Sequence, residues 1–272
     1  MQGRLSALVG DRIQAFPWPS WREEFAIAGQ HGFRLMEWTL DQDRLHENPL
    51  LTPAGQAAIR ELSRRHGLAI PSLTGDCFMQ VPFWKAPAGV REGLERDFLA
   101  VADACAAVGI SMIVVPLVDN GRLETAVQED LLVAFLHRHA ARHAARGLRV
   151  LFESDFGPAP LRTFIDRLDP GVFGLNYDTG NSAALGFDPV EEFAAYGDRI
   201  VNVHIKDRVL GGGTVPLGAG GADFDTVFEQ LARIKYPGNF ILQTARAADG
   251  DHAGVLRAYR DTVARMLERH AA

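Results

Sequence analysis

The feature that most constrains this sequence is the regular alternation of strand-like and helix-like segments along its whole length. Short apolar runs of strand length are each followed by a longer helical segment, and this unit occurs eight times. The alternation predicts a parallel sheet covered by helices. Eight such units close naturally into a (β/α)8 barrel. The expected strands are Gly3–Leu5, Phe33–Trp38, Leu68–Leu73, Met112–Leu117, Val150–Glu153, Phe173–Asp178, the stretch Ile200–Asp207 and Phe240–Gln243.

The segments between these runs predict the covering helices. Ser20, with Glu23 three residues later, is a candidate N-cap, and Asp223 is another. The chain has no linker or low-complexity segment, so we expect residues 1–272 to form a single (β/α)8 TIM barrel domain. The alternative, an open doubly wound sheet, would require a glycine fingerprint after an early strand. The expected helices are the segment from Ser20 to His31, Pro53–His66, Ala88–Val108, Arg122–Arg146, Pro158–Leu168, Pro189–Tyr196, a segment after Asp223, and His252–Glu268.

Composition argues against several classes of protein. The formal net charge is −6, and lysines and arginines are nowhere dense enough to follow a phosphate backbone, so nucleic acid is not an expected partner. Two cysteines are too few for a disulfide framework. The amino terminus lacks the apolar core of a signal peptide, and no stretch is long and apolar enough to span a membrane. We therefore expect a cytoplasmic protein without a membrane partner.

Polar side chains occur at the carboxyl ends of four successive predicted strands. These residues are Glu153, Asp178, His204 and Gln243. In a barrel of this kind such side chains share one face, so all four are expected to reach a single ion. Two carboxylates, an imidazole and an amide oxygen suit a divalent cation, Mn²⁺ first, with Mg²⁺, Co²⁺ or Zn²⁺ as alternatives. A structural zinc site is not expected, because the set contains no thiolate.

The same residues carry a resemblance to a known family. Glu153 and the segments Asn176–Asn181, Val203–Asp207 and Pro216–Phe224 resemble motifs of the xylose isomerase-like barrel superfamily. Within it, the nearest groups are L-xylulose-5-phosphate 3-epimerase-like and ketose 3-epimerase-like proteins. The resemblance implies that Glu153, Asp178 and His204 bind the metal, and that Glu153 is also the base that removes a proton beside a carbonyl. The metal would hold the charge of the resulting enediolate.

One position departs from the family pattern. The family usually has a second glutamate at the end of the eighth strand, which serves as ligand and second base, and this chain has Gln243 there. An amide oxygen can bind a hard cation, but it cannot exchange a proton at neutral pH. Two alternatives follow: a single base shuttles the proton on one face, or another residue replaces the lost glutamate. The candidates for that replacement are Asp76, Asp155, Lys206 and His252.

Five further residues are expected to contact a small-molecule sugar or sugar phosphate. Asn181 would bind a substrate hydroxyl or the metal-bound water, and Lys206 would supply a positive charge for an oxyanion or phosphate, or else pair with a neighbouring carboxylate. Arg208 and Arg246 closely follow their strands and are candidates to bind a phosphate or a sugar carboxylate. Glu37 would hydrogen-bond the substrate, orient His204 or form a buried pair with an arginine.

The leading functional hypothesis is a divalent-metal sugar or sugar-phosphate isomerase or epimerase that can form homo-oligomers. A lyase of the inosose dehydratase type is the first alternative, and the mass of the product separates the two. An apurinic endonuclease of the same superfamily would need many histidine ligands for several zinc ions, and this chain has one well-placed histidine. The remaining alternative is a metal- or carbohydrate-binding barrel whose catalysis was altered when Gln243 replaced the second glutamate.

Overall fold

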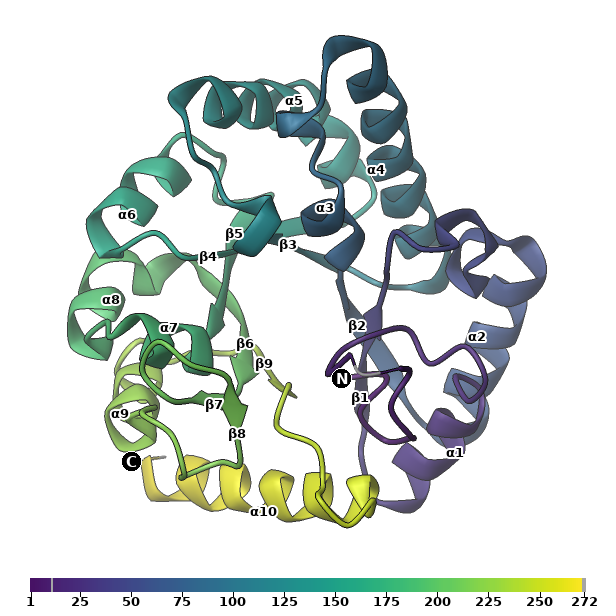
Figure 1. The fold of residues 1–272 in the computed structure, drawn as a ribbon, viewed down its shortest axis with the longest axis vertical. Helices are drawn as coiled ribbons and strands as arrows, with labels where there is room; N and C mark the ends of the chain where they lie inside the picture. The colour runs from purple at the N-terminus through teal and green to yellow at the C-terminus, as the bar shows by residue number, and fades with distance from the viewer. Residues whose placement is uncertain (11, 271–272) are drawn as a thin grey trace.

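The computed structural model describes residues 1–10 and 12–270 and contains a nearly closed barrel of parallel strands inside a ring of helices (Figure 1). Within the described residues, seven strands form the barrel sheet in the order β1-β2-β3-β4-β5-β6-β9, and two short strands form a separate hairpin. The barrel strands are β1 (Leu35–Thr39), β2 (Ala69–Thr74), β3 (Met112–Leu117), β4 (Arg149–Ser154), β5 (Phe173–Asp178), β6 (Ile200–Ile205) and β9 (Asn239–Leu242); the hairpin pairs β7 (Asp207–Arg208) with β8 (Thr214–Val215).

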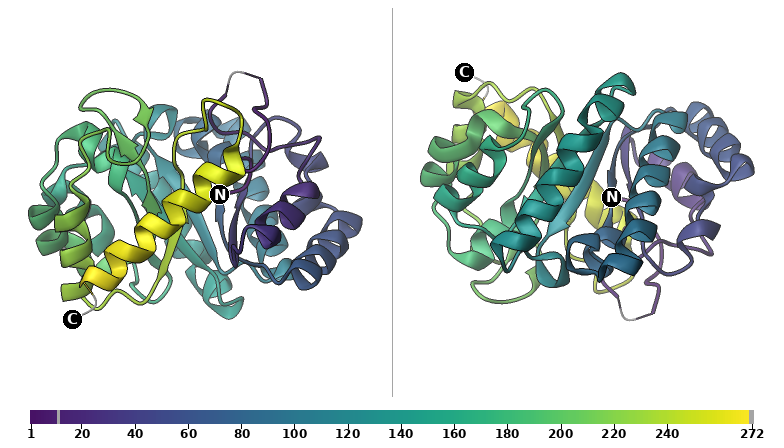
Figure 2. Two further views of the ribbon diagram at one scale, coloured as in Figure 1. Left: turned by 90° about the horizontal axis from the view of Figure 1, so that it is seen from below. Right: turned by 90° about the horizontal axis from the view of Figure 1, so that it is seen from above.

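The helices cover the outside of the barrel, and the long helix α10 crosses the side where β9 lies (Figure 2). In the part of the chain that the structure describes, none of them combines the length and hydrophobicity that a membrane crossing needs. They are α1 (Glu23–Gln30), α2 (Pro53–His66), α3 (Asp76–Gln80), α4 (Ala88–Val108), α5 (Ala126–Ala145), α6 (Pro158–Asp166), α7 (Thr179–Leu185), α8 (Pro189–Tyr196), α9 (Phe224–Arg233) and α10 (His252–His270).

The sequence predicted most of these elements, with differences at their ends. Asp223 is confirmed as an N-cap, because its Oδ1 accepts a hydrogen bond from the N–H of Thr226 at 3.0 Å. The prediction that Ser20 caps α1 is wrong: the helix begins at Glu23, and the Ser20 hydroxyl donates to Ser6 instead. The short helices α3 and α7 were not predicted, and each directly follows a barrel strand.

The predicted first strand, Gly3–Leu5, is wrong. These residues form turns and bends, since Gly3 has a left-handed φ of 78° that ends an extended conformation. The segment nevertheless fills the gap between β9 and β1. The amino group of Met1 donates to the carbonyl of Leu242 at 3.3 Å, and the N–H of Gln2 donates to the carbonyl of Glu37 at 2.9 Å. The eighth position of the barrel is therefore held by a short irregular segment.

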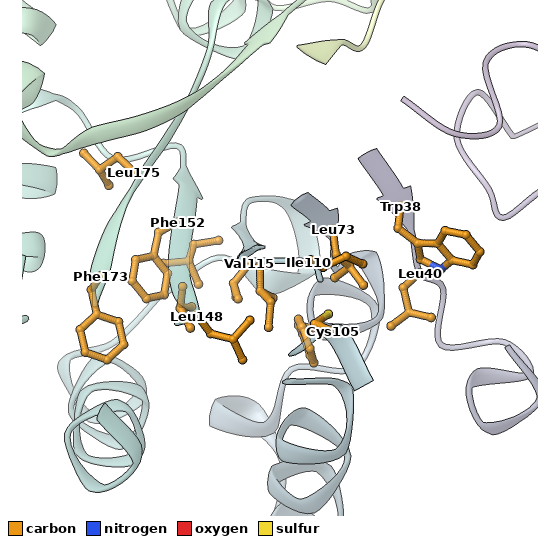
Figure 3. Packing of buried hydrophobic residues seen from close by; sticks show 14 of the residues in the cluster. Trp38, Leu40, Leu73, Cys105, Ile110, Val115, Leu148, Phe152, Phe173 and Leu175 are labelled. Carbon is orange, nitrogen blue, oxygen red and sulfur yellow. The ribbon is translucent and has the colours of Figure 1, made fainter. Parts of the chain in front are cut away.

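The hydrophobic core lies between the strands and the outer helices (Figure 3). Trp38 on β1 packs against Phe16 and Trp21, and Phe152 on β4 packs against Phe164 on α6 with ring centroids 5.2 Å apart. Side chains alternate between the two faces of a strand, so the residues next to these in sequence point into the barrel. The site described below is built from those inward positions.

The buried carboxylate of Glu24 on α1 holds the amino-terminal segment that fills the gap between β9 and β1. Glu24 accepts hydrogen bonds from the N–H of Gly3 at 2.7 Å, the N–H of Leu5 at 3.2 Å and the hydroxyl of Ser6 at 2.6 Å. We expect Glu24→Ala to lower the free energy of unfolding by roughly 2–4 kcal/mol, because it leaves buried donors unsatisfied. Urea unfolding measures this loss. Glu23→Ala, a change at the exposed neighbour, is the control, and an equal effect of both variants would contradict the assignment.

Candidate functional site

Three predicted ligands converge at the carboxyl ends of adjacent strands. Glu153 lies near the end of β4, Asp178 ends β5 and His204 lies near the end of β6, where it pairs in register with Asp178. All three residues are buried. One potential ligand atom from each lies within 4.8 Å of the other two. The arrangement provides two carboxylates and an imidazole around one point, a donor set that suits a divalent cation.

Potential ligand atoms of these residues face one another. Asp178 Oδ1 caps α7 by accepting from the N–H groups of Gly180 and Asn181, both at 2.9 Å, and its Oδ2 faces His204. His204 Nδ1 lies 3.1 Å from Glu153 Oε2 and 3.9 Å from Asp178 Oδ2. Neither ring nitrogen makes a well-aligned hydrogen bond with a described residue, and Nδ1 is the one that faces both Glu153 and Asp178. A buried, unsatisfied nitrogen between two carboxylates fits a cation-binding position.

Glu37 lies directly beneath this cluster and is fully buried. Its Oε1 lies 2.8 Å from His204 Nε2 and accepts from the Thr74 hydroxyl, and its Oε2 accepts from the Ser72 hydroxyl at 2.7 Å. The predicted contact between Glu37 and a substrate disagrees with this placement, because the carboxylate is enclosed by protein donors. Glu37 instead holds the His204 ring, the orienting role that carboxylates take behind a metal-binding histidine.

The charges of the cluster stabilise one another against burial. Burial lowers the pKa of His204, but the carboxylates of Glu37 and Glu153 outweigh this effect and raise it to about 10. Burial opposes ionisation of Glu37 as well, yet its contacts with His204 lower its pKa to about 2. The pKa of Glu153 is lowered by His204 and Lys206 despite burial, whereas burial raises the pKa of Asp178. A cation that binds Nδ1 therefore replaces a proton there.

Gln243 lies at the same mouth, and both ends of its amide are hydrogen-bonded to side chains there. Its Oε1 accepts a hydrogen bond from Lys206 Nζ at 2.8 Å, and Lys206 Nζ also lies 3.4 Å from Asp178 Oδ2. Its Nε2 donates to Gln14 Oε1 at 3.0 Å. That Gln243 supplies a fourth ligand therefore stays a prediction from the sequence. The fourth position holds an amide that pairs with an ammonium group.

A cavity of about 560 Å³ opens above the cluster and is lined in part by Glu153 and Gln243. This volume lies in the range of small-molecule sites. Three of the predicted substrate-binding residues line it: Asn181, Lys206 and Arg208. Asn181 Nδ2 donates to Glu153 Oε1 at 2.6 Å, and Asn181 Oδ1 accepts from Arg208 Nη1 at 2.8 Å. The base candidate is therefore connected to two polar groups of the cavity wall.

Arg246 lies outside this cavity. Its Nη1 donates to the backbone carbonyl of Ser6, so the guanidinium fixes the amino-terminal loop. The role of Arg246 in substrate binding stays a prediction, since its guanidinium contacts the amino-terminal loop and not the cavity wall.

Two further cavity residues, Gln14 and Asp76, form a pair that the sequence did not predict. Asp76, the first residue of α3, accepts a hydrogen bond at Oδ2 from Gln14 Nε2 at 2.6 Å. Gln14 Oε1 accepts from Gln243 and also from Arg4 Nη2 at 3.1 Å. Asp76 carries a weak signal, since it comes two residues after the end of β2 and was one of the candidates from the sequence, whereas Gln14 carries none. Together they extend the site from β9 to β2.

Comparison with known proteins assigns the family. A family model described as "Xylose isomerase-like TIM barrel" matches residues 25–267, and the chain belongs to this family. Similar curated proteins include an inosose dehydratase of Geobacillus kaustophilus (strain HTA426), 33% identical over 137 residues that cover 42% of this chain and 44% of that protein. An inosose dehydratase of Clostridium botulinum (strain Alaska E43 / Type E3) is 28% identical over 56% of this chain and 63% of its own length. The chain thus spans about half the length of the curated relatives it matches.

Solved structures show the same fold at low sequence identity. A D-psicose 3-epimerase in the presence of D-fructose superimposes with a TM-score of 0.74 at 14% identity, covering 90% of this chain and 93% of that chain. An L-ribulose 3-epimerase also gives a TM-score of 0.74, at 17% identity, covering 98% of this chain and 93% of that chain. These proteins and the curated relatives are sugar-modifying enzymes, and the structural likeness concerns the fold alone.

The converging ligands predict a measurable metal affinity. We expect the wild-type protein, once treated with EDTA, to bind one equivalent of Mn²⁺. Asp178→Asn and Glu153→Gln should each weaken this binding by about 100-fold or more, because even the loss of a residue that orients a metal ligand costs about 10- to 100-fold in affinity. Isothermal titration calorimetry measures the affinities. Asp155→Asn is the matched control, because Asp155 lines the same cavity but pairs with Arg122. Equal affinities of all four proteins would contradict the site.

Proposed function

We propose that the protein is a divalent-metal-dependent sugar or sugar-phosphate isomerase or epimerase that removes a proton from a carbon beside a carbonyl group. The observation that carries this proposal is the position of Glu153. This carboxylate lies next to Asp178 and His204 and lines the cavity. A base beside a metal site at the wall of a sugar-sized cavity is the arrangement that proton abstraction next to a carbonyl requires.

The surroundings of Glu153 suit a base. Its lowered pKa keeps the carboxylate ionised at neutral pH. Asn176 Nδ2 donates to Oε2 at 2.8 Å, and Asn181 donates to Oε1, so the carboxylate has a fixed orientation. A cation bound by Glu153, Asp178 and His204 would polarise the substrate carbonyl and balance the negative charge that develops on its oxygen. The mixed oxygen and nitrogen donors favour Mn²⁺, with Mg²⁺, Co²⁺ or Zn²⁺ as alternatives.

The cavity wall suits a sugar substrate. Asn181 offers an amide to a hydroxyl, while Lys206 and Arg208 offer positive charge to an oxyanion or phosphate. Lys206 is already held by Gln243 and Asp178, so it presents its ammonium group in a fixed position. Homo-oligomer formation and a cytoplasmic location stay predictions from the sequence.

A second candidate function is a lyase of the inosose dehydratase type, which the names of the curated relatives favour. Glu153 would again remove a proton beside a carbonyl, and a hydroxyl group would then leave from the neighbouring carbon. Both reactions begin with the same proton transfer, so the site geometry serves either. The products differ, because an isomer keeps the mass of the substrate whereas dehydration removes one water.

One experiment tests both candidates. We expect the Mn²⁺-loaded protein in D₂O to exchange deuterium into at least one of three probes, namely a ketohexose, a pentulose 5-phosphate and an inosose. Mass spectrometry then separates an isomer from a dehydrated product. Glu153→Gln should lower the exchange by about 100-fold or more, because a general base contributes about 10²–10⁴-fold. Unchanged exchange in this variant would show that Glu153 is not the base, and Asp155→Asn is again the matched control.

A substitution at Gln243 tests whether the protein is an active enzyme or a barrel that has lost catalysis. In the structure Gln243 donates to Gln14, and a carboxylate cannot make that donation. We therefore expect Gln243→Glu to lower turnover by about tenfold or more, since small misplacements of site residues cost up to about 10²-fold. Steady-state assays with the best probe measure the change. If catalysis was lost with the glutamate, the same substitution raises epimerase activity instead.

A further inference from the structure

An epimerisation that returns a proton to the opposite face, or a dehydration that protonates a leaving hydroxyl, needs a second proton-transfer group. The residue at the expected position, Gln243, cannot exchange a proton at neutral pH. We infer that Asp76 is this group: it donates a proton to the substrate after Glu153 has removed one, from another side of the same cavity. This inference rests on the proposed function and adds a catalytic residue to it.

The first support is position. Asp76 and Glu153 line one cavity. Asp76 comes after β2 and Glu153 lies near the end of β4, and these two strands are separated in the barrel by β3. Their carboxyl groups therefore approach the cavity from different sides. Gln14 is the link to the usual position of the second acid, because it donates to Asp76 and accepts from Gln243. One amide side chain and two hydrogen bonds thus separate the Asp76 carboxyl group from the Gln243 amide.

The second support is that the fold holds Asp76 firmly. Cys77, the next residue, donates its N–H to the carbonyl of Leu40 at 2.9 Å. Phe78 packs on Phe98 in the core with ring centroids 4.5 Å apart. On the other side, a Cβ at Gly75 would clash with the Phe78 ring and lie 3.1 Å from a backbone oxygen, so this tight approach requires glycine. A side chain on such a rigid turn meets the positional demand of catalysis.

The third support is the state of the carboxyl group. Oδ2 accepts the hydrogen bond from Gln14, and Oδ1 carries no hydrogen bond from a described residue, so one oxygen remains for a substrate. Burial raises the pKa of Asp76 to about 7, and this places both protonation states within reach at neutral pH, as a general acid requires. The charged groups that act on or lie around Asp76 are Asp41, Glu153, Lys206, Arg4 and Arg12.

The other candidates for this role are engaged elsewhere. Asp155 is paired with Arg122, whose Nε lies 2.5 Å from its Oδ2. Lys206 Nζ donates to both Gln243 and Asp178. His252 begins α10, and its Nδ1 accepts from the N–H of Ala247 at 3.2 Å, so it serves the end of a helix.

The proposed step conserves protons and electrons. Glu153 takes a proton from the carbon beside the carbonyl, and the electron pair of the broken C–H bond forms the enediolate. The protonated Asp76 then gives its proton to that carbon on the other face, which forms the new C–H bond and restores the carbonyl. In a dehydration the same proton goes to the departing hydroxyl, which leaves as water when its C–O bond breaks. Glu153 and Asp76 afterwards return to their starting states by exchange with water.

The experiment separates the two half-reactions. Asp76→Asn keeps the shape of the side chain but has no proton to transfer, so in D₂O with Mn²⁺ and the best of the three probes we expect deuterium exchange within about threefold of wild type and product formation lowered by about 100-fold. Asp76→Glu should recover part of the product formation, and Asp155→Asn is the matched control. Product formation at the wild-type rate, or an equal loss of exchange and product, overturns the assignment.

A second measurement tests Asp76 even if the wild-type protein acts on none of the probes, an outcome that would refute only the proposed function. Folded Asp76 holds its proton up to about pH 7, whereas in the unfolded chain it loses it near 3.8, so the contribution of Asp76 to stability falls as pH rises between these values. With EDTA present, the Tm of Asp76→Asn minus that of wild type should grow from about pH 5 to pH 7 and then level off. A constant difference overturns the proposal, because a permanently ionised Asp76 has no proton to donate.

Discussion

The central interaction of this structure is the buried His204 side chain held between Glu37 and Glu153. Its Nε2 lies 2.8 Å from Glu37 and its Nδ1 lies 3.1 Å from Glu153, although all three residues are buried. Charges taken out of water persist only when they are paired and hydrogen-bonded, so each member of this trio depends on the other two. Because the three residues come from β1, β4 and β6, one electrostatic arrangement ties together distant parts of the barrel wall.

Side-chain amides complete this arrangement inside the barrel. Asn176 donates to Glu153, and Asn202 donates to Asn176 at 2.8 Å and to Glu37 at 3.4 Å. These contacts close a ring of polar groups through the interior. Barrels of this type are usually filled by layers of bulky apolar side chains. Here the middle of the barrel is polar. Each residue of the ring holds the side chain of the next one in place, and the ring as a whole orients Glu153 and His204.

Much of this could be predicted because parallel strands end at one edge of a sheet. Glu153, Asp178 and His204 each interrupt or end an apolar run, and that local signal was enough to place them together. The first strand could not be predicted in the same way. Gly3 and Leu5 donate their N–H groups to the Glu24 carboxylate and not to a neighbouring strand, and this contact can be seen only in the folded chain.

Asp76 was among the candidates from the sequence, but its pairing with Gln14 could not be predicted, for another reason. Gln14 contacts Asp76, 62 positions away, and Gln243, 229 positions away, and no period of the sequence encodes such pairs. The placement of Glu37 was ambiguous for a similar reason, since a strand-end carboxylate can face a cavity or a buried partner. Its two hydroxyl donors, Ser72 and Thr74, lie on the neighbouring strand and become visible only when the register is known.

The amide of Gln243 connects Lys206 to Gln14 and, through Gln14, to Asp76. An amide both accepts and donates, so Gln243 receives a hydrogen bond from Lys206 and gives one to Gln14. A carboxylate at this position would accept from Lys206 but would face the oxygen of Gln14 with a second acceptor. The amide therefore orients Gln14, and Gln14 with its own amide can then donate to Asp76. The donor-to-acceptor direction of these hydrogen bonds fixes the orientation of both amides. The chain of hydrogen bonds ends at the carboxyl group of Asp76, which comes after β2.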